Sequence, residues 1–410
     1  MKNNTDKIRP AKVTAAEFKI LGLAILLVLC GSLGLDIHLA SLPNIMTYMH
    51  TDKQHMQQSV TFFILGVALS LLVYGPLSDK IGRKIVVIFG LSIACICSFM
   101  ATMSTSIEIF LIFRLLQGIG SGVCWGLGRV IVADVLQGER LAALGSYLSM
   151  FVSLSPMLAP ALGGYMQSWF GWQSNFILLG VFIFVVLMAL VFFLEETNKN
   201  LNADAFRIRP LALNYLSFFK ERVFVGCMLL SGISMSATII YVTMSSFIYQ
   251  HEFGVSPIFF GWLSVVVGIV GVIGKAISPK VIFRLKRYNT LILGILIILF
   301  SGLMLSVCIY FGFNNKYWVL LSASLRAVGV LFIAMIAMSM ALSPFSNNRG
   351  SAGALYGSFQ LLIPFLFSGI ITSSMSLSGS SILALAMIGL SVMGLLVYFF
   401  LIKPSNAGAR

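Results

Sequence analysis

The chain has 410 residues, of which 59% are hydrophobic and only 10% are charged, and its formal net charge is +14. A soluble protein of this length has a surface that needs more polar side chains than this composition supplies, which excludes a soluble enzyme or binding domain. The basic residues gather in a few polar segments between long apolar runs, so the positive charge indicates membrane topology rather than nucleic-acid binding.

Apolar runs long enough to cross a bilayer, about 20 residues each, recur along the whole chain and predict an all-α membrane protein. Twelve runs leave no room for a sizeable soluble domain. The predicted spans are 17–41, 57–78, 84–104, 107–136, 141–167, 174–194, 222–248, 257–279, 289–312, 317–342, 350–374 and 380–402.

The longest polar interruption divides the chain near its middle, with six spans on either side. We therefore expect an N-terminal six-helix half at 1–194, a cytoplasmic linker at 195–221 and a C-terminal six-helix half at 222–410. Two such halves predict a substrate site between them near the membrane midplane. Within the linker, the mixed apolar and polar stretch 206–219 is expected to lie in the membrane interface.

Lys and Arg residues crowd the segments on one side of the predicted bundle. The N-terminus, the linker and the segment after the eighth span carry most of them, whereas the opposite loops carry only Lys53 and Lys316. Because cytoplasmic loops are enriched in Lys and Arg, both termini are predicted to be cytoplasmic. The expected location is the inner membrane of a bacterium.

Two ionisable residues stand deep in the first half. Asp36 is the only acid deep inside a predicted span, and Arg114 lies inside the fourth span. At 1.5 Å per residue the two fall within about one helical turn of the same depth. Ionisable groups inside a membrane mark function by default, so Asp36 is predicted to carry a proton, with Arg114 as its partner or as an anion ligand. A structural Asp–Arg pair, or an arginine bonded to carbonyls of the first helix, remains an alternative for each.

Ser121 and Trp125 share a helical face with Arg114. This face mixes small, polar and aromatic side chains, as the wall of a cavity does. It is therefore predicted to line the substrate cavity.

The second half contributes three further cavity candidates, Tyr241, Met244 and Arg326. Aromatic and methionine side chains give adaptable surfaces that suit promiscuous binding, although packing in the core or against lipid is the alternative for each. Arg326 has no acid in the spans of its own half. Two arginines and a single acid suit an anionic or zwitterionic ligand at least as well as a cationic one.

The turn between the second and third spans reads GPLSDKIGRK from Gly75 to Lys84. It resembles the signature of the major facilitator superfamily, which implies a twelve-helix fold of two pseudo-symmetric halves. The resemblance also implies a conformational latch in which Arg83 pairs with Asp79 and with Asp134. Such a latch would stabilise the outward-facing state and break when the halves rock. Arg129, near the same end of the fourth span, is interpreted as a further gate or latch residue.

The fifth span contains Pro156, Pro160, Gly163 and Gly164. It resembles the end of a glycine- and proline-rich signature of proton-coupled exporters, with other small residues where further glycines are expected. The stretch 36–176 as a whole resembles the bicyclomycin/chloramphenicol-resistance type of drug–proton antiporter.

The leading hypothesis is therefore a non-enzymatic, proton-coupled secondary transporter that exports drug-like or amphipathic small molecules by alternating access. Its expected partners are the substrate, protons and the lipid bilayer, with no cofactor, metal or nucleic acid, and a monomer is expected. One alternative is a dedicated metabolite transporter, such as a siderophore exporter or a carrier of a small anionic nutrient. Another is a substrate-sensing receptor, although an intact latch signature argues against a protein that does not cycle.

Overall fold

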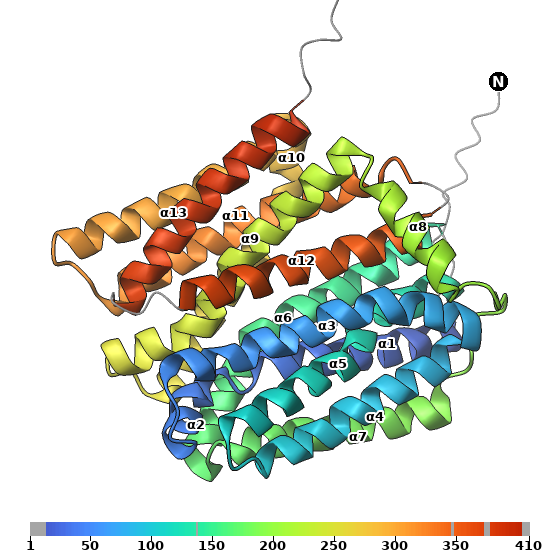
Figure 1. The fold of residues 1–410 in the computed structure, drawn as a ribbon, viewed down its shortest axis with the longest axis horizontal. Coiled ribbons are helices and arrows are strands. Elements are labelled where there is room, and N and C mark those ends of the chain that lie inside the picture. The colour runs from blue at the N-terminus through green and yellow to red at the C-terminus, as the bar shows by residue number, and fades with distance from the viewer. Residues whose placement is uncertain (1–13, 137, 346–347, 373–377, 404–410) are drawn as a thin grey trace, which may run out of the picture.

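The computed structural model describes residues 14–136, 138–345, 348–372 and 378–403, and in these ranges the chain is a bundle of helices without strands (Figure 1). A 3-10 turn (Leu39–Ser41) joins α1 to α2, and π-helical segments (Ile248–Glu252 and Tyr398–Ile402) extend α9 and α13. The α-helices are α1 (Ala15–Asp36), α2 (Leu42–Tyr48), α3 (Lys53–Ile81), α4 (Arg83–Thr102), α5 (Ile107–Val135), α6 (Gly138–Phe170), α7 (Gln173–Phe193), α8 (Ile208–Phe218), α9 (Arg222–Phe247), α10 (Pro257–Tyr310), α11 (Lys316–Leu342), α12 (Arg349–Thr372) and α13 (Gly379–Val397).

Eleven helical stretches of the described residues are long and apolar enough to cross a membrane. One of them, α10, has 54 residues, which is more than twice the length needed for a hydrocarbon core of roughly 30 Å. Its backbone breaks at Lys286, where φ is 64° and ψ is 166°. Two spans therefore meet at this residue, and the predicted all-α fold with twelve spanning helices is confirmed.

The first predicted span, 17–41, ends in a different way from the prediction. The α-helix stops at Asp36, and after the 3-10 turn the chain is helical again to Tyr48. Pro43 lies in the first turn of α2, where its missing N–H is tolerated, whereas inside a continuous helix it would remove a hydrogen bond. Asp36 is thus the last residue of α1 and stands beside an irregular segment of backbone.

The bundle has two distinct ends, which carry α8 and α2 respectively (Figure 1). The end with α8 and the linker is called the linker end here, and the opposite end the far end. The linker helix α8 lies against α3, because the Tyr215 hydroxyl donates a hydrogen bond to the Leu72 carbonyl at 3.1 Å. The interface stretch predicted at 206–219 thus contains an 11-residue amphipathic helix beside the bundle.

Helices from the two halves of the chain pack together along α3 with α12 and along α6 with α10, and Figure 1 shows α3 beside α12. The Ser358 hydroxyl donates to the Ala68 carbonyl at 2.7 Å, and at the far end the Gln250 amide donates to the Ala40 carbonyl at 2.9 Å. Gly261 of α10 permits the close packing of α10 on α6, because a side chain there would overlap the backbone of Ala161 in α6. The halves are joined from the middle of the bundle to the far end.

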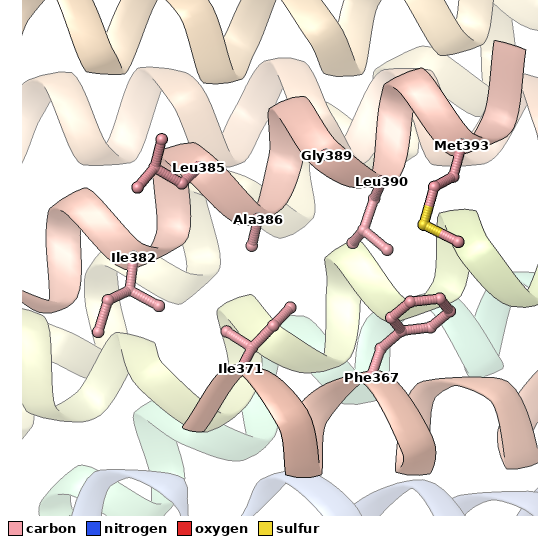
Figure 2. A pocket seen from close by; sticks show the side chains of 8 residues that line it. All are labelled: Phe367, Ile371, Ile382, Leu385, Ala386, Gly389, Leu390 and Met393. Carbon is pink, nitrogen blue, oxygen red and sulfur yellow. The ribbon is translucent and has the colours of Figure 1, made fainter. Parts of the chain in front are cut away.

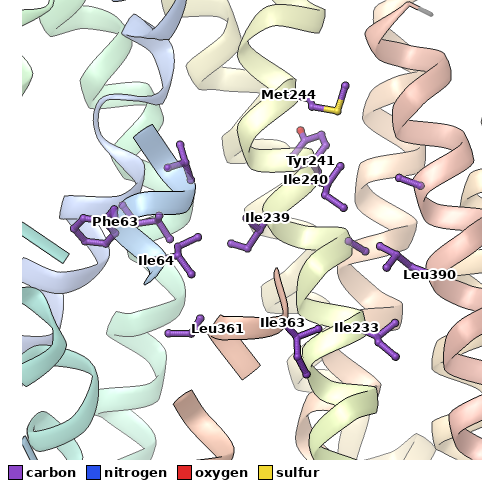
Figure 3. Close-up of a cluster of buried hydrophobic side chains, with 14 of the residues drawn as sticks. Phe63, Ile64, Ile233, Ile239, Ile240, Tyr241, Met244, Leu361, Ile363 and Leu390 are labelled. Atoms are coloured by element: carbon purple, nitrogen blue, oxygen red, sulfur yellow. The ribbon is translucent and has the colours of Figure 1, made fainter. Parts of the chain in front are cut away.

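One apolar cluster runs through both halves of the chain. Figure 3 shows Phe63 and Ile64 of α3 on one side of it, Tyr241 and Met244 of α9 on another, and Leu361 of α12 below Ile64. Within a membrane this association depends on close packing rather than on transfer of apolar surface from water. The buried charged side chains of the spans, Asp36, Arg114 and Arg326, are therefore embedded in a tightly packed apolar interior.

Candidate functional site

The turn between α3 and α4 brings together three of the predicted latch residues. The Arg83 guanidinium lies 2.7 Å from an Asp79 carboxylate oxygen and 3.2 Å from an Asp134 carboxylate oxygen. Gly82 makes the turn with φ of 101°, a conformation that favours glycine. Arg129 stays outside the cluster, since its side chain is exposed and makes no ion pair within the part of the chain that the structure describes.

Linker residues complete the latch, and sequence reasoning missed them. The Glu196 carboxylate accepts hydrogen bonds from the backbone N–H groups of Arg83 (2.9 Å) and Lys84 (3.1 Å). A carboxylate is favourable there because the first amides of α4 are unpaired and the helix dipole is positive at this end. Thr197 donates a hydrogen bond to Asp134 at 3.1 Å, and the Asn202 N–H donates to the Asp79 carbonyl at 3.0 Å. The one sequence feature that could have indicated these linker contacts was the acidic pair at 195–196, because the turn between α3 and α4 is basic.

Asp36 is 5% exposed at the end of α1, and its carboxylate has no hydrogen bond or ion pair among the described residues. His38, interpreted from sequence as a packing residue or one at the cavity mouth, is wholly buried with its ring 5.5 Å from that of Phe176. Neither ring nitrogen of His38 has a hydrogen-bond partner in the ranges that the structure describes. An acid and an imidazole thus lie in the same buried region without polar partners of their own.

Arg114 is wholly buried in α5 and is held by neutral groups. Its Nε donates to the Ser59 carbonyl at 3.2 Å, and its Nη1 donates to the Gly34 carbonyl at 3.1 Å and also to the Gln117 side chain. The guanidinium stacks on the Phe63 ring at 4.5 Å. In this conformation Arg114 takes the alternative arrangement weighed above, bonded to a carbonyl of the first helix. Arg114 thus bonds the backbone two residues before Asp36 but does not pair with the Asp36 carboxylate.

Ser121 and Trp125 of α5 lie against two glycines of α1. A Cβ atom at Gly31 would be 2.9 Å from the Trp125 indole nitrogen, and one at Gly34 would be 3.7 Å from the Ser121 hydroxyl oxygen. The buried indole N–H has no hydrogen-bond partner in the described part of the chain. The face predicted to line a cavity therefore packs on α1 here and keeps one free donor.

In the second half, Arg326 of α11 is 3% exposed. Its Nη1 donates to the Thr238 hydroxyl at 2.7 Å, and its guanidinium carbon lies 4.7 Å from the centre of the Tyr241 ring. Among the described residues the buried Arg326 Nε has no hydrogen-bond partner, and the buried hydroxyls of Tyr241 and Tyr249 lie close to each other without a well-formed hydrogen bond. Met244, one turn along α9 from Tyr241, is also buried (Figure 3). The structure thus groups Arg326 with Tyr241 and adds Thr238 and Tyr249, which sequence reasoning did not single out.

The predicted motif of the fifth span lies within α6, where Pro156 and Pro160 are accommodated in one helix of 33 residues. Gly163 faces the carbonyl oxygen of Ile37 beside the end of α1, and Gly164 faces that of Pro257 at the start of α10. A side chain at either position would overlap these oxygens. The two glycines therefore set the approach of α6 to both halves of the chain.

A cavity of about 340 Å³ lies between α12 and α13 (Figure 2). Its lining is wholly apolar and includes none of the ionisable residues discussed above. The lining residues are Phe367, Ile371, Ile382, Leu385, Ala386, Gly389, Leu390 and Met393. A site with no polar group has nothing to orient a charged or hydrogen-bonding ligand, so the candidate site is the buried ionisable groups.

Comparison with known proteins gives the same assignment along most of the chain. The model of the Major Facilitator Superfamily matches residues 24–368. The chain is 26% identical over 382 residues to a bicyclomycin resistance protein homolog of Haemophilus influenzae, covering 90% of this chain and 92% of the relative. It is 27% identical over 388 residues to multidrug resistance protein D of Escherichia coli, covering 92% and 93%.

Among solved structures, the inward-open xylose transporter XylE from Escherichia coli superposes with a TM-score of 0.74 at 15% identity, covering 96% of this chain and 98% of that one. At this identity the likeness concerns the fold alone. With the family model matching well over half of its length, this multi-pass membrane protein belongs to the Major Facilitator Superfamily of transporters.

Proposed function

We propose that the protein is a proton-coupled secondary transporter that exports drug-like or amphipathic small molecules, with Asp36 as the proton carrier. The observation that carries the proposal is the Asp36 carboxyl, which is buried in a spanning segment without a hydrogen-bond or ionic partner in the described chain. The apolar interior disfavours a charge there, and binding a proton removes it. The irregular backbone from 37 to 41 gives this position a means of changing its surroundings during a cycle. The names of the bacterial relatives support a drug-like substrate.

Alternating access is supported by where the halves touch. Their contacts run from the middle of the bundle to the far end, where the Trp262 indole also donates to the Tyr165 hydroxyl at 3.2 Å. Lys275 of α10 donates a hydrogen bond to the Ser153 hydroxyl of α6 although its side chain is exposed, and Arg129, nearer the linker end, is exposed without an ion pair in the described chain. We assign this arrangement to a state that faces the linker end. The latch is intact in this state, whereas the sequence led us to expect it in the opposite, outward-facing state. It can form here because its contacts join the first half to the linker and not to the second half.

The linker end is assigned to the cytoplasm, with both termini on that side, and the membrane to the bacterial inner membrane. The density of Lys and Arg in the linker and in the turns of that end supports this orientation. In this proposal the segments 1–194 and 222–410 rock as two bodies around a central site. A single chain can enclose that site, so a monomer is sufficient.

The test is growth of a pump-deficient bacterial host that expresses the wild type, Asp36→Asn or Asp204→Asn. Asp204 is an exposed linker acid that pairs with Arg207 at 2.8 Å, so its substitution is the matched control. The panel contains cationic, neutral, zwitterionic and anionic toxic compounds, and membrane expression of each variant is measured. We expect resistance to several compounds, retained in Asp204→Asn and lost in Asp36→Asn.

Proton movement is measured separately in inverted membrane vesicles with a pH-sensitive dye, by adding compounds that were exported in the growth assay. Wild-type vesicles should release protons on addition, and Asp36→Asn vesicles should not. Resistance that survives Asp36→Asn would leave an exporter but reject Asp36 as its proton site. No resistance from a well-expressed wild type would reject the drug exporter.

A dedicated metabolite transporter is the second candidate function. It is favoured by the excess of buried cations over acids within the described parts of the spans, where Arg114 and Arg326 accompany one buried acid, Asp36. In that case a narrow set of anionic compounds would be carried and the toxic panel would give no phenotype.

A further inference from the structure

The buried guanidinium of Arg326 is short of partners. Only one of its nitrogens has a hydrogen bond in the described chain, to the neutral hydroxyl of Thr238, and the Nε is buried without one. The buried hydroxyls of Tyr241 and Tyr249 lie close to each other without a well-formed hydrogen bond in the described chain, and both are within electrostatic reach of Arg326. A buried polar group without a partner is costly, and a buried charge more so. Three donors of two kinds, one guanidinium N–H and two phenol hydroxyls, therefore lie together without a well-formed hydrogen bond.

Arg114 provides an internal comparison, because it occupies the corresponding position in the first half. Its guanidinium is held by two backbone carbonyls and by the Gln117 side chain, and two of these acceptors belong to the helical framework itself. Arg326 has no carbonyl acceptor among the described residues. Arg114 also has one buried nitrogen, Nη2, without a partner in the described chain, but its Nε and Nη1 are bonded to the helical framework. Arg326 has only a side-chain hydroxyl as partner, so more of its donors are available to another molecule.

The second half also has no acid to neutralise Arg326. Between residues 222 and 410 the sequence contains one acidic residue, Glu252. Its carboxylate already accepts hydrogen bonds from the Ser380 hydroxyl at 2.7 Å and from the backbone N–H of Gly379 at the start of α13. A counter-charge for Arg326 must come from outside this half.

We propose that Arg326, together with Tyr241 and Tyr249, binds an anionic group of the transported molecule, a carboxylate or a sulfonate on an amphipathic aromatic or aliphatic body. An arginine binds a carboxylate through two parallel N–H donors, and the tyrosine hydroxyls add further ones. Met244 and the Tyr241 ring supply apolar surface beside the charge. This inference rests on the proposed transport function and names its substrate class. Because Arg326 is buried in this state, the group enters when the halves move.

The probe is radiolabelled 2-naphthoate, measured by equilibrium dialysis against the full-length protein purified in detergent. Unlabelled 2-naphthamide and 2-naphthylmethylammonium serve as neutral and cationic competitors on the same ring system. We expect saturable binding of naphthoate with weak competition by the other two. Arg326→Gln should weaken naphthoate binding by about tenfold or more, since hydrogen bonds to a charged group are lost. Arg284→Gln, an exposed arginine in the α10 turn, should leave it unchanged.

Tyr249→Phe guards against a folding defect in Arg326→Gln, because it removes only a hydroxyl that makes no well-formed hydrogen bond with the described residues. It should weaken naphthoate binding several-fold without changing the affinity for naphthamide. Folded Arg326→Gln and Tyr249→Phe proteins with wild-type affinity for naphthoate would overturn the proposal. So would the absence of saturable naphthoate binding to the wild type.

The two proposals fail in different ways. Dialysis involves no proton gradient, so Asp36→Asn should still bind naphthoate. Resistance to cationic compounds that depends on Asp36, without naphthoate binding, would reject the anion site and keep the transporter. Naphthoate binding that depends on Arg326, with transport unaffected by Asp36→Asn, would keep the site and reject the proton carrier.

Discussion

Gly164→Ala in α6 adds one methyl group, which should push the two halves of the protein slightly apart. A Cβ atom there would overlap the Pro257 carbonyl oxygen and would lie 2.9 Å from its carbon and 3.1 Å from the Ile258 Cα. Carbon atoms pack favourably at about 3.5–4.0 Å, so α6 and α10 must move apart by roughly 0.5 Å or more. Overpacking of this kind costs about 1–3 kcal/mol. The better helix propensity of alanine offsets about 1 kcal/mol of that loss.

The measurement is thermal unfolding of Gly164→Ala purified in detergent, followed by intrinsic fluorescence. Gly145→Ala is the matched control, because Gly145 lies in the same helix and a Cβ there would meet nothing within 4 Å. A net loss on the order of 1 kcal/mol corresponds to an apparent Tm lowered by roughly 2–4 °C in Gly164→Ala, whereas Gly145→Ala should melt at or above the wild type. If Gly164→Ala melted as high as Gly145→Ala, the close contact between α6 and α10 would be refuted.

Two further predictions concern ionised helix caps. Glu196→Gln should destabilise the protein by about 1 kcal/mol, because the Glu196 carboxylate caps two amides of α4. Glu195→Gln is the control and should not destabilise it, since 89% of the Glu195 side chain is exposed. Equal melting temperatures for the two variants would contradict the cap. Asp52→Ala should lower the apparent Tm at neutral pH, since the His55 N–H bond caps α3 and holds the pKa of Asp52 below its usual range. A depressed pKa stabilises the folded state above about pH 4 and loses this effect as acid protonates the carboxyl. The deficit of Asp52→Ala should therefore shrink in melting curves taken from pH 7 to pH 3, and a deficit that grew on acidification would reject the cap.

The spans could be predicted because each apolar run is long enough to cross a bilayer, and the bilayer tolerates few other structures. Helix ends were less predictable, because they depend on single residues. Pro43 starts a new helix beyond the predicted end of the first span, and the break at Lys286 has no glycine or proline at that residue to announce it.

Single residues of the candidate site were predictable where a local motif or an unusual residue type marked them. Asp79 and Arg83 stand in a ten-residue motif, and Asp36 and Arg114 are rare residue types for a membrane span. Their partners were not predictable, because an arginine bonds a carbonyl of any residue type. Glu196 contacts a turn more than a hundred residues away, and no local pattern encodes that distance.

The docking of the linker on the latch has a practical consequence for dividing the protein into co-expressed halves. A cut at the end of the apolar run, after residue 194, would leave the α4 amides uncapped and Asp134 without its Thr197 donor. A first fragment that extends through Asn202 keeps all these contacts, including the hydrogen bond to the Asp79 carbonyl. The piece able to reassemble with 222–410 is therefore longer than its six membrane helices.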